Sequence, residues 1–190
     1  MAKTITATIP PAIVNALYEL QKDPEEIEYG GAIDFEIIKG KVGVERIIAY
    51  TGGYASLSKE LTDHIFKDPD IEFTFHTHPT QTIACPSFGD IHTLLTTKPS
   101  TMMIISGNEV LILTKGDNTP EPSAVYDKNR IKAAFLNLGF GNRGRWTYSD
   151  RNKLLKTLTD YLDLKSNIYK SKAPITFIAQ LAKSEASKGG

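Results

Sequence analysis

The hydrophobic residues of this chain follow two different spacings. Where they alternate with polar residues, the pattern predicts strands, and where they recur every three or four positions, it predicts amphipathic helices. Strands are expected over residues 3–9, 32–38, 42–50, 71–78, 102–105 and 110–113. Helices are expected over residues 11–22, 56–67, 87–98, 128–138 and 149–164. This order predicts an α/β fold in which a mixed β-sheet is flanked by helices.

Turn-forming residues separate these elements. Lys39-Gly40-Lys41 and Ser106-Gly107-Asn108 each lie between two predicted strands, so each predicts a hairpin. Two prolines mark a loop over residues 116–123. A chain of 190 residues is expected to form one domain. We expect a core over residues 1–127, a C-terminal helical extension packed on the same domain over 128–183, and a flexible tail over 184–190.

The charge balance argues against a role in binding nucleic acid. Lys plus Arg and Asp plus Glu number 22 each, so no overall field attracts nucleic acid or an anionic membrane. No run of about 18 apolar residues offers a membrane span, and the N-terminal segment does not resemble a secretion signal. Cys85 is the one cysteine, which fits a reducing compartment. We therefore expect a soluble, cytoplasmic protein.

Two histidines at the end of a predicted strand are the first candidates for chemistry. Phe73 and Phe75 occupy odd positions of that strand, and His76 and His78 occupy even ones. Alternate side chains of a strand point to the same face, so the two imidazoles are expected to project together while Thr77 points away. Neutral imidazole nitrogens are good zinc ligands, and a catalytic zinc site takes three protein ligands and leaves one position for water.

Asp90 is the candidate third ligand. It follows His78 by 12 positions, in the first turn of the helix predicted over 87–98, where its carboxylate can return to the strand end. The alternative is that Ser87 and Asp90 form only a capping box at the start of that helix. Alone, the Ser-x-x-Asp pattern favours the capping box, but joined to the two histidines it favours a metal site. Cys85 is expected to be a small buried residue rather than a ligand.

These residues resemble the signature of the JAMM (MPN+) zinc metalloproteases. That signature consists of an upstream glutamate, then His-Ser/Thr-His-Pro, a short spacer, and Ser-x-x-Asp. The chain matches it in His76-Thr77-His78-Pro79 and in Ser87-Phe88-Gly89-Asp90. The one departure is the spacer, residues 79–86, which is one residue longer than is common in the family. By the order of predicted elements, the resemblance covers roughly residues 5–115.

The resemblance implies an architecture, a metal and a reaction. The fold would be the JAMM/MPN architecture, which is cytidine-deaminase-like, and Zn²⁺ would be bound by His76, His78 and Asp90. Ser87 would donate a hydrogen bond to the oxyanion during hydrolysis of an amide by activated water. The substrates would be conjugates of ubiquitin or of a ubiquitin-like protein, cleaved after the C-terminal Gly-Gly of the modifier.

Glu28 matches the upstream glutamate of the family. It opens the segment Glu28-Tyr29-Gly30-Gly31, which fits the family pattern Glu-x-x-Gly at the entry to a strand. In this role Glu28 would be the general base that takes a proton from the water and later passes it to the leaving amine. Glu25 and Glu26 are close by in the sequence and Glu36 lies on the same predicted strand, so all three are alternatives.

The motif also allows other functions. Within the family, the alternatives are an enzyme that trims the C-terminus of a sulfur-carrier protein, and a cell-wall or phage-tail endopeptidase. From a different class, the alternative is a non-catalytic MPN scaffold protein, since some relatives keep the fold and lose the ligands. The presence of all three ligand positions argues against a scaffold. The predicted helices from residue 128 onward are a candidate face for a protein complex or a homo-oligomer.

Overall fold

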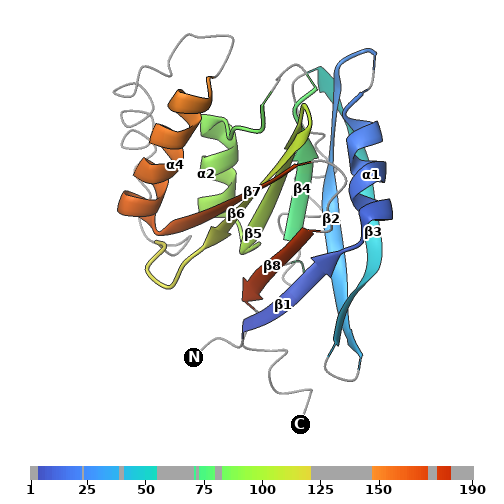
Figure 1. Ribbon diagram of the computed structural model, residues 1–190, viewed down its shortest axis with the longest axis horizontal. Coiled ribbons are helices and arrows are strands. Elements are labelled where there is room, and N and C mark those ends of the chain that lie inside the picture. Colours follow the sequence, from blue (N-terminus) through green and yellow to red (C-terminus); the bar gives the residue numbers. More distant parts are fainter. Residues whose placement is uncertain are drawn as a thin grey trace.

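Six strands form a mixed β-sheet at the centre of the molecule (Figure 1). The structure is a computed structural model that describes residues 4–22, 24–38, 41–54, 71, 73–79, 83–120, 147–170 and 175–180. The strands follow the order β3 (Lys41–Tyr54), β2 (Ile27–Ile38), β4 (Phe73–Thr77), β5 (Thr101–Ser106), β6 (Glu109–Lys115) and β7 (Leu164–Lys170). β4 and β5 run parallel, and the other neighbouring pairs are antiparallel.

Helices cover both faces of this sheet (Figure 1). On one face, α1 (Pro11–Leu20) packs over a core that includes Val14, Leu17, Phe75, Met103 and Ile112. On the other face, α2 (Phe88–Thr96) and α4 (Tyr148–Leu162) pack over a core that includes Ile91, Leu94, Ile104, Leu111 and Leu154. The two cores take alternate residues from the same strands, as the pleat of a sheet requires. The prediction of a mixed sheet flanked by helices is confirmed.

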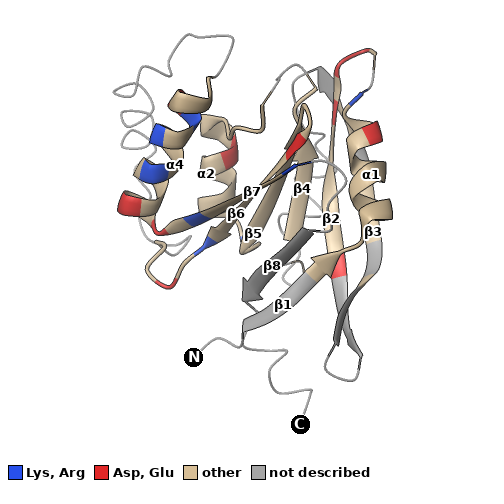
Figure 2. Cartoon of the chain, viewed as in Figure 1, with Lys and Arg blue, Asp and Glu red and all other residues tan. Residues whose placement is uncertain are grey.

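The pleat of the two central strands decides which way the first histidine points. His76 lies beside Ile104 in the parallel ladder of β4 and β5, and neighbours in a ladder share a face of the sheet. Ile104 belongs to the core beneath α2 and α4, so His76 faces these helices. Phe75 lies in the opposite core, beneath α1. β4 and β5 carry no Lys, Arg, Asp or Glu (Figure 2), so His76 is the one titratable side chain on these two strands.

Two further strands form a small second sheet from distant parts of the chain. β1 (Thr4–Ile9) pairs antiparallel with β8 (Ile175–Gln180), from Thr4 opposite Gln180 to Ile9 opposite Ile175. Figure 1 shows this pair beside the lower part of the main sheet. β1 is the first strand that the sequence predicts, whereas β8 has no counterpart among the predicted strands.

The predicted helical extension over residues 128–183 is wrong for β7 and β8, which are strands. In the described part of that range, α4 is helical and ends before Asp163, whose left-handed backbone, with φ of 50°, precedes the strand that pairs with β6. Leu164, expected in the last turn of the helix, is the first residue of β7. Within the polar sequence LKSNIYK, Leu164 is the one buried residue, so the hydrophobic pattern of this segment does not predict a strand. The segment is a strand because it pairs with β6.

Several predicted elements lie outside the described residues. These are the helices over 56–67 and 128–138, the tail over 184–190, and the turn residues Lys39 and Gly40. The helices predicted over 11–22 and 87–98 are present as α1 and α2, each slightly shorter than predicted. In the part of the chain that the structure describes, no helix is both long enough and apolar enough to span a bilayer.

Candidate metal centre

The end of β4 carries the two histidines, and neighbouring strands fix its position. Gly30 of β2 lies opposite His76. His78 follows the last residue of β4 and stays in line because its N–H donates to the Ile105 carbonyl at 2.9 Å. The Ser106 hydroxyl donates to the His78 carbonyl at 3.0 Å. The end of β5 therefore holds both main-chain polar groups of His78.

The start of α2 brings Asp90 to this strand end. Ser87 is the N-cap of the helix: its hydroxyl oxygen accepts the Asp90 N–H at 3.1 Å, and Asp90 Oδ2 accepts the Ser87 N–H at 2.6 Å. The capping box that the sequence offered as the alternative to a metal site is therefore present. The two interpretations are compatible, because the same carboxylate also faces both histidines.

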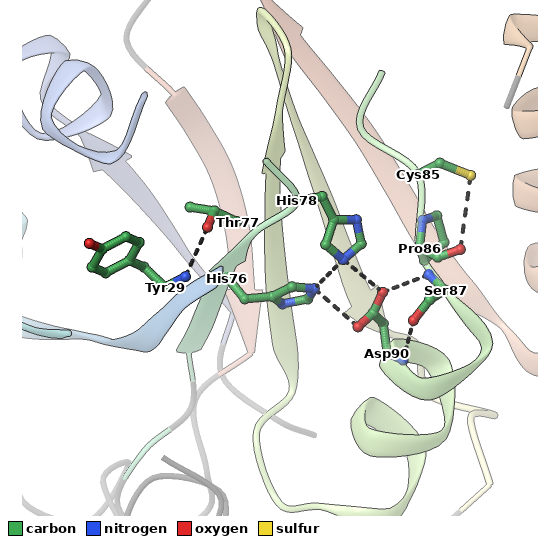
Figure 3. Close-up of polar contacts among 8 residues, drawn as sticks. All are labelled: Tyr29, His76, Thr77, His78, Cys85, Pro86, Ser87 and Asp90. Carbon is green, nitrogen blue, oxygen red and sulfur yellow. Dashed lines mark hydrogen bonds and ion pairs between the residues drawn. The ribbon is translucent and has the colours of Figure 1, made fainter. Parts of the chain in front are cut away.

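Ligand atoms of His76, His78 and Asp90 converge on one point (Figure 3). His76 Nε2 lies 3.1 Å from His78 Nε2 and 3.0 Å from Asp90 Oδ1, and His78 Nε2 lies 3.4 Å from Asp90 Oδ2. In a tetrahedral zinc site with bonds of about 2.0–2.1 Å, the ligand atoms lie about 3.3 Å from one another. His76 Nε2 approaches one oxygen of the Asp90 carboxylate and His78 Nε2 the other, so the three side chains lie about as close together as the ligands of such a site.

The group is withdrawn from water, with His76 2% exposed, His78 5% and Asp90 9%. Burial opposes ionisation of Asp90, but the two neighbouring imidazoles outweigh it and hold the pKa of this carboxyl well below its usual range. A buried carboxylate needs a partner of opposite charge, and a divalent cation among these three groups supplies one. Two histidines and one carboxylate form a donor set suited to zinc with one position left open.

The first residues of β2 run along the end of β4 and bring Glu28 toward the group. Gly30 lies opposite His76, and the Tyr29 N–H donates to Thr77 Oγ1 at 2.9 Å. Thr77 therefore points toward β2 and away from the two imidazoles, as the sequence predicts (Figure 3). β2 and β4 are antiparallel and Gly30 lies opposite His76. Glu28, two residues before Gly30, therefore lies along β2 in the direction of the residues that follow His76 on the other strand.

The Glu28 carboxyl is influenced by the charges of the three candidate ligands. Burial raises the pKa of this half-buried carboxyl, His78 and His76 act in the opposite direction, and Asp90 adds to the rise. A carboxyl with a raised pKa holds and releases a proton more readily near neutral pH than an ordinary glutamate does. The raised pKa of Glu28 is therefore compatible with the role of general base, which stays a prediction.

The competing glutamates are placed differently. Glu25 and Glu26 are exposed and precede β2. Glu36 pairs through its main chain with Gly43 of β3, well beyond the short part of β2 that contacts β4. The structure therefore favours Glu28 among the four glutamates that the sequence offers.

Ser87 borders the group at the start of α2 (Figure 3). Its side chain is half-buried, and its oxygen accepts the Asp90 N–H. A serine hydroxyl both accepts and donates, so this contact leaves the O–H proton for another acceptor. The contact of Ser87 with an oxyanion stays a prediction.

Cys85 takes no part in the group. Its side chain is fully buried in the core beneath α2 and α4, and in Figure 3 its sulfur points away from His78, with Sγ 3.9 Å from the Pro86 carbonyl. Burial, against a smaller opposite effect of Arg151, raises the pKa of the thiol to about 12. The prediction of a small buried residue is confirmed. Because the thiolate is the form that binds metals, a thiol with so high a pKa is poorly suited to be a ligand.

Three buried polar residues close to the site in the fold, Ser106, Glu109 and Arg151, are not marked by any sequence pattern. The sequence pattern places Ser106 in a turn, yet it is the last residue of β5 and its hydroxyl donates to the His78 carbonyl. Arg151 and Glu109 form an ion pair, and each residue is only 5% exposed. Charged residues are expected at the surface, so no local pattern marks these two as buried partners.

Comparison with known proteins assigns no family, because no protein-family model and no curated protein matches the chain. His76, His78 and Asp90 therefore support a function through their geometry and their motif alone.

Proposed function

We propose that this protein is a zinc-dependent metallopeptidase of the JAMM type, which hydrolyses an isopeptide or peptide bond. The observation that carries the proposal is the close approach of the His76 and His78 Nε2 atoms to each other and to the two oxygens of the Asp90 carboxylate, at 3.0–3.4 Å. The half-buried carboxyl of Glu28 lies beside them. The His-Thr-His-Pro and Ser-x-x-Asp motifs belong to the same family, and we expect the mixed sheet to follow its JAMM/MPN architecture.

The chain's own residues supply binding, proton transfer and charge stabilisation. The chemistry available from zinc at His76, His78 and Asp90 is Lewis-acid polarisation of a carbonyl and a water pKa of about 7. Glu28 accepts a proton from the attacking water and delivers it to the leaving amine, and its raised pKa suits both steps. Ser87 donates its hydroxyl proton in a hydrogen bond to the oxygen that becomes negatively charged.

The substrate class that we propose is a conjugate of ubiquitin or of a ubiquitin-like protein, cleaved after the Gly-Gly of the modifier. The JAMM resemblance supports this choice. The burial of the centre agrees with it, since His76 and His78 are only 2% and 5% exposed. Glycine has no side chain, so an extended Gly-Gly tail approaches a buried centre more closely than other sequences do.

Metal analysis and a cleavage assay test the proposal. Elemental analysis of the purified protein is expected to give one zinc ion per chain. Mass spectrometry is expected to show cleavage of ubiquitin or ubiquitin-like fusions after Gly-Gly. Glu28→Gln is expected to keep zinc and to lower the hydrolysis rate about 100-fold or more. Glu25→Gln, a change at an exposed neighbouring glutamate, is the matched control and is expected to alter neither measurement.

The outcomes separate the competing functions. Cleavage of sulfur-carrier fusions or of cell-wall peptides in place of ubiquitin fusions would assign the protein to the corresponding alternative within the family. Bound zinc without hydrolysis of any of these substrates would favour a scaffold. A wild-type protein that binds no zinc would refute the proposal.

A further inference from the structure

Arg151 of α4 and Glu109, the first residue of β6, form a buried ion pair. Each residue is 5% exposed. Removing two charges from water costs free energy, and their mutual attraction often no more than balances that cost. The pair is therefore not expected to add much to the free energy of unfolding, and its contacts with the neighbouring main chain are of more interest.

The ion pair holds both main-chain polar groups of Ala84. Arg151 Nη1 donates to the Ala84 carbonyl at 3.2 Å, and Glu109 Oε2 accepts the Ala84 N–H at 3.4 Å. Ala84 is fully buried, so these groups need protein partners. The preceding residue, Ile83, forms a β-bridge with Gly107 at the turn between β5 and β6. The segment that leads into α2 is thereby tied to α4 and β6.

The path from Ala84 to Asp90 is short and restrained. Cys85 and Pro86 follow and are both buried. The ring of Pro86 fixes its φ angle, which removes one of the main rotations available to the chain. Ser87 then caps α2, and the capping box joins it to Asp90. A displacement of Ala84 is therefore passed on to the first turn of the helix.

The ring of Tyr148 also contacts the arginine. The Arg151 Cζ atom lies 5.1 Å from the centre of the Tyr148 ring, within range of a cation–π interaction. Both residues belong to the first turns of α4. The guanidinium group thus contacts both an aromatic ring of its own helix and the carboxylate of Glu109.

We propose that Arg151 and Glu109 are positioning residues of the metal centre: by tethering Ala84, they set the place of Asp90 relative to the two histidines. The inference rests on the metal site of the proposed function. It gives each half of the ligand set its own support, since β5 holds the histidine strand and α4, through Arg151, holds the start of α2.

The test replaces the ion pair without leaving a buried charge. The double variant Arg151→Met/Glu109→Leu removes both contacts to Ala84. Apolar replacement of a buried ion pair is often tolerated by the fold, although the buried main-chain groups of Ala84 then lose their partners and some loss of stability is expected. The readouts are zinc affinity by chelator competition, the visible absorption spectrum of the Co²⁺-loaded protein, and amide hydrogen exchange of residues 87–90 in the metal-free protein. We expect zinc affinity about tenfold weaker, an altered cobalt spectrum and faster exchange of these amides.

Two further variants act as controls. Leu158 lies on α4, as Arg151 does, belongs to the same core as Ala84 and is 3% exposed. Its side chain has no polar group that could bond to Ala84, so Leu158→Ala removes packing alone. It is expected to destabilise the fold while leaving the cobalt spectrum unchanged. Arg151→Lys keeps the charge but loses the planar fork of the guanidinium, so it is expected to weaken zinc binding by less than the double variant does. It also serves as the test if the double variant does not fold.

The outcomes distinguish this inference from the proposed function. Wild-type zinc affinity, cobalt spectrum and amide exchange in the Arg151 variants would overturn the inference and leave the proposed function intact. A wild-type protein that binds neither zinc nor cobalt would overturn the proposed function, and with it the role assigned to Arg151 and Glu109.

Discussion

Asp90 Oδ2 accepts the Ser87 N–H at 2.6 Å and lies 3.4 Å from His78 Nε2. One carboxylate therefore closes the capping box of α2 and faces the candidate metal centre. α4 begins with a second capping box, in which the Asp150 N–H donates to Thr147 Oγ1 at 3.1 Å. The two helix starts share a motif but differ in their surroundings, so mutation can separate the two roles of Asp90.

Asp90→Ala and Asp150→Ala are expected to behave differently. Asp150→Ala removes the carboxylate of a capping box, and such a change is worth about 0.3–1.5 kcal/mol in free energy of unfolding. It should leave the zinc content unchanged. Asp90→Ala removes an equivalent cap together with the charged ligand, so we expect zinc to be lost. Elemental analysis and urea unfolding of both variants check this, and a full zinc complement in Asp90→Ala would contradict the assignment of the third ligand.

His76→Ala is expected to abolish stable zinc binding, because the two ligands that are left do not close a catalytic zinc site. His92→Ala is the matched control. His92 is half-buried on α2, and its ring centre lies 6.1 Å from that of Phe88. The His92→Ala variant should keep the same zinc content as the wild type. Equal zinc content in the two variants, measured by elemental analysis after dialysis, would rule out His76 as a ligand.

Ser106→Ala is expected to loosen the second histidine. The fully buried Ser106 hydroxyl donates to the His78 carbonyl, so its removal costs about 1–3 kcal/mol in free energy of unfolding. Zinc affinity should fall as well, because His78 loses a support. Thr74→Val removes another buried hydroxyl, whose bond to the Thr101 carbonyl is longer, at 3.5 Å, and should leave zinc affinity unchanged. Chelator competition compares the two, and equal affinities would exclude the supporting role of Ser106.

Cys85 makes stability depend on pH on the alkaline side. Burial raises the pKa of its thiol to about 12, whereas a thiol in the unfolded chain titrates at about 8.5. Above about pH 8.5 the unfolded state loses a proton that the native state keeps. Stability therefore falls with rising pH, by up to about 1.4 kcal/mol per unit.

Cys85→Ala should flatten this decline between about pH 8.5 and 10. Burial also raises the pKa of Tyr18 to about 12, and this residue acts in the same direction, but only above about pH 10, where an exposed tyrosine would ionise. Urea unfolding across the lower window isolates the cysteine. Parallel stability curves for the wild type and Cys85→Ala would show that the thiol does not contribute.

The parts of the site that were predictable from the sequence are those set by local geometry. Successive side chains of a strand point to opposite faces, so the sequence predicted that His76 points away from Phe75 and Thr77, as it does. The Ser-x-x-Asp pattern predicted a helix start, and the structure has its capping box there. These properties depend on residues a few positions apart, so the chain encodes them without reference to the rest of the fold.

Pairing between distant segments was not predictable in the same way. The polar strand β7 owes its structure to β6, and β8 owes its structure to β1, at the other end of the described chain. In the same way, Arg151 and Glu109 are 42 positions apart, and their charge predicts that both lie at the surface. The packing of α4 buries them together. Propensity and periodicity carry no information about which partner a segment finds.

The sequence by itself determined which side chains are candidates for chemistry and to which face of a strand or turn of a helix His76 and Asp90 belong. Only the tertiary structure decided that His76, His78 and Asp90 meet at 3.0–3.4 Å and that Glu28 comes within electrostatic range of them. The reason is physical: the residues between a strand end and a helix start allow many separations, and the packing of α2 on the sheet selects one of them.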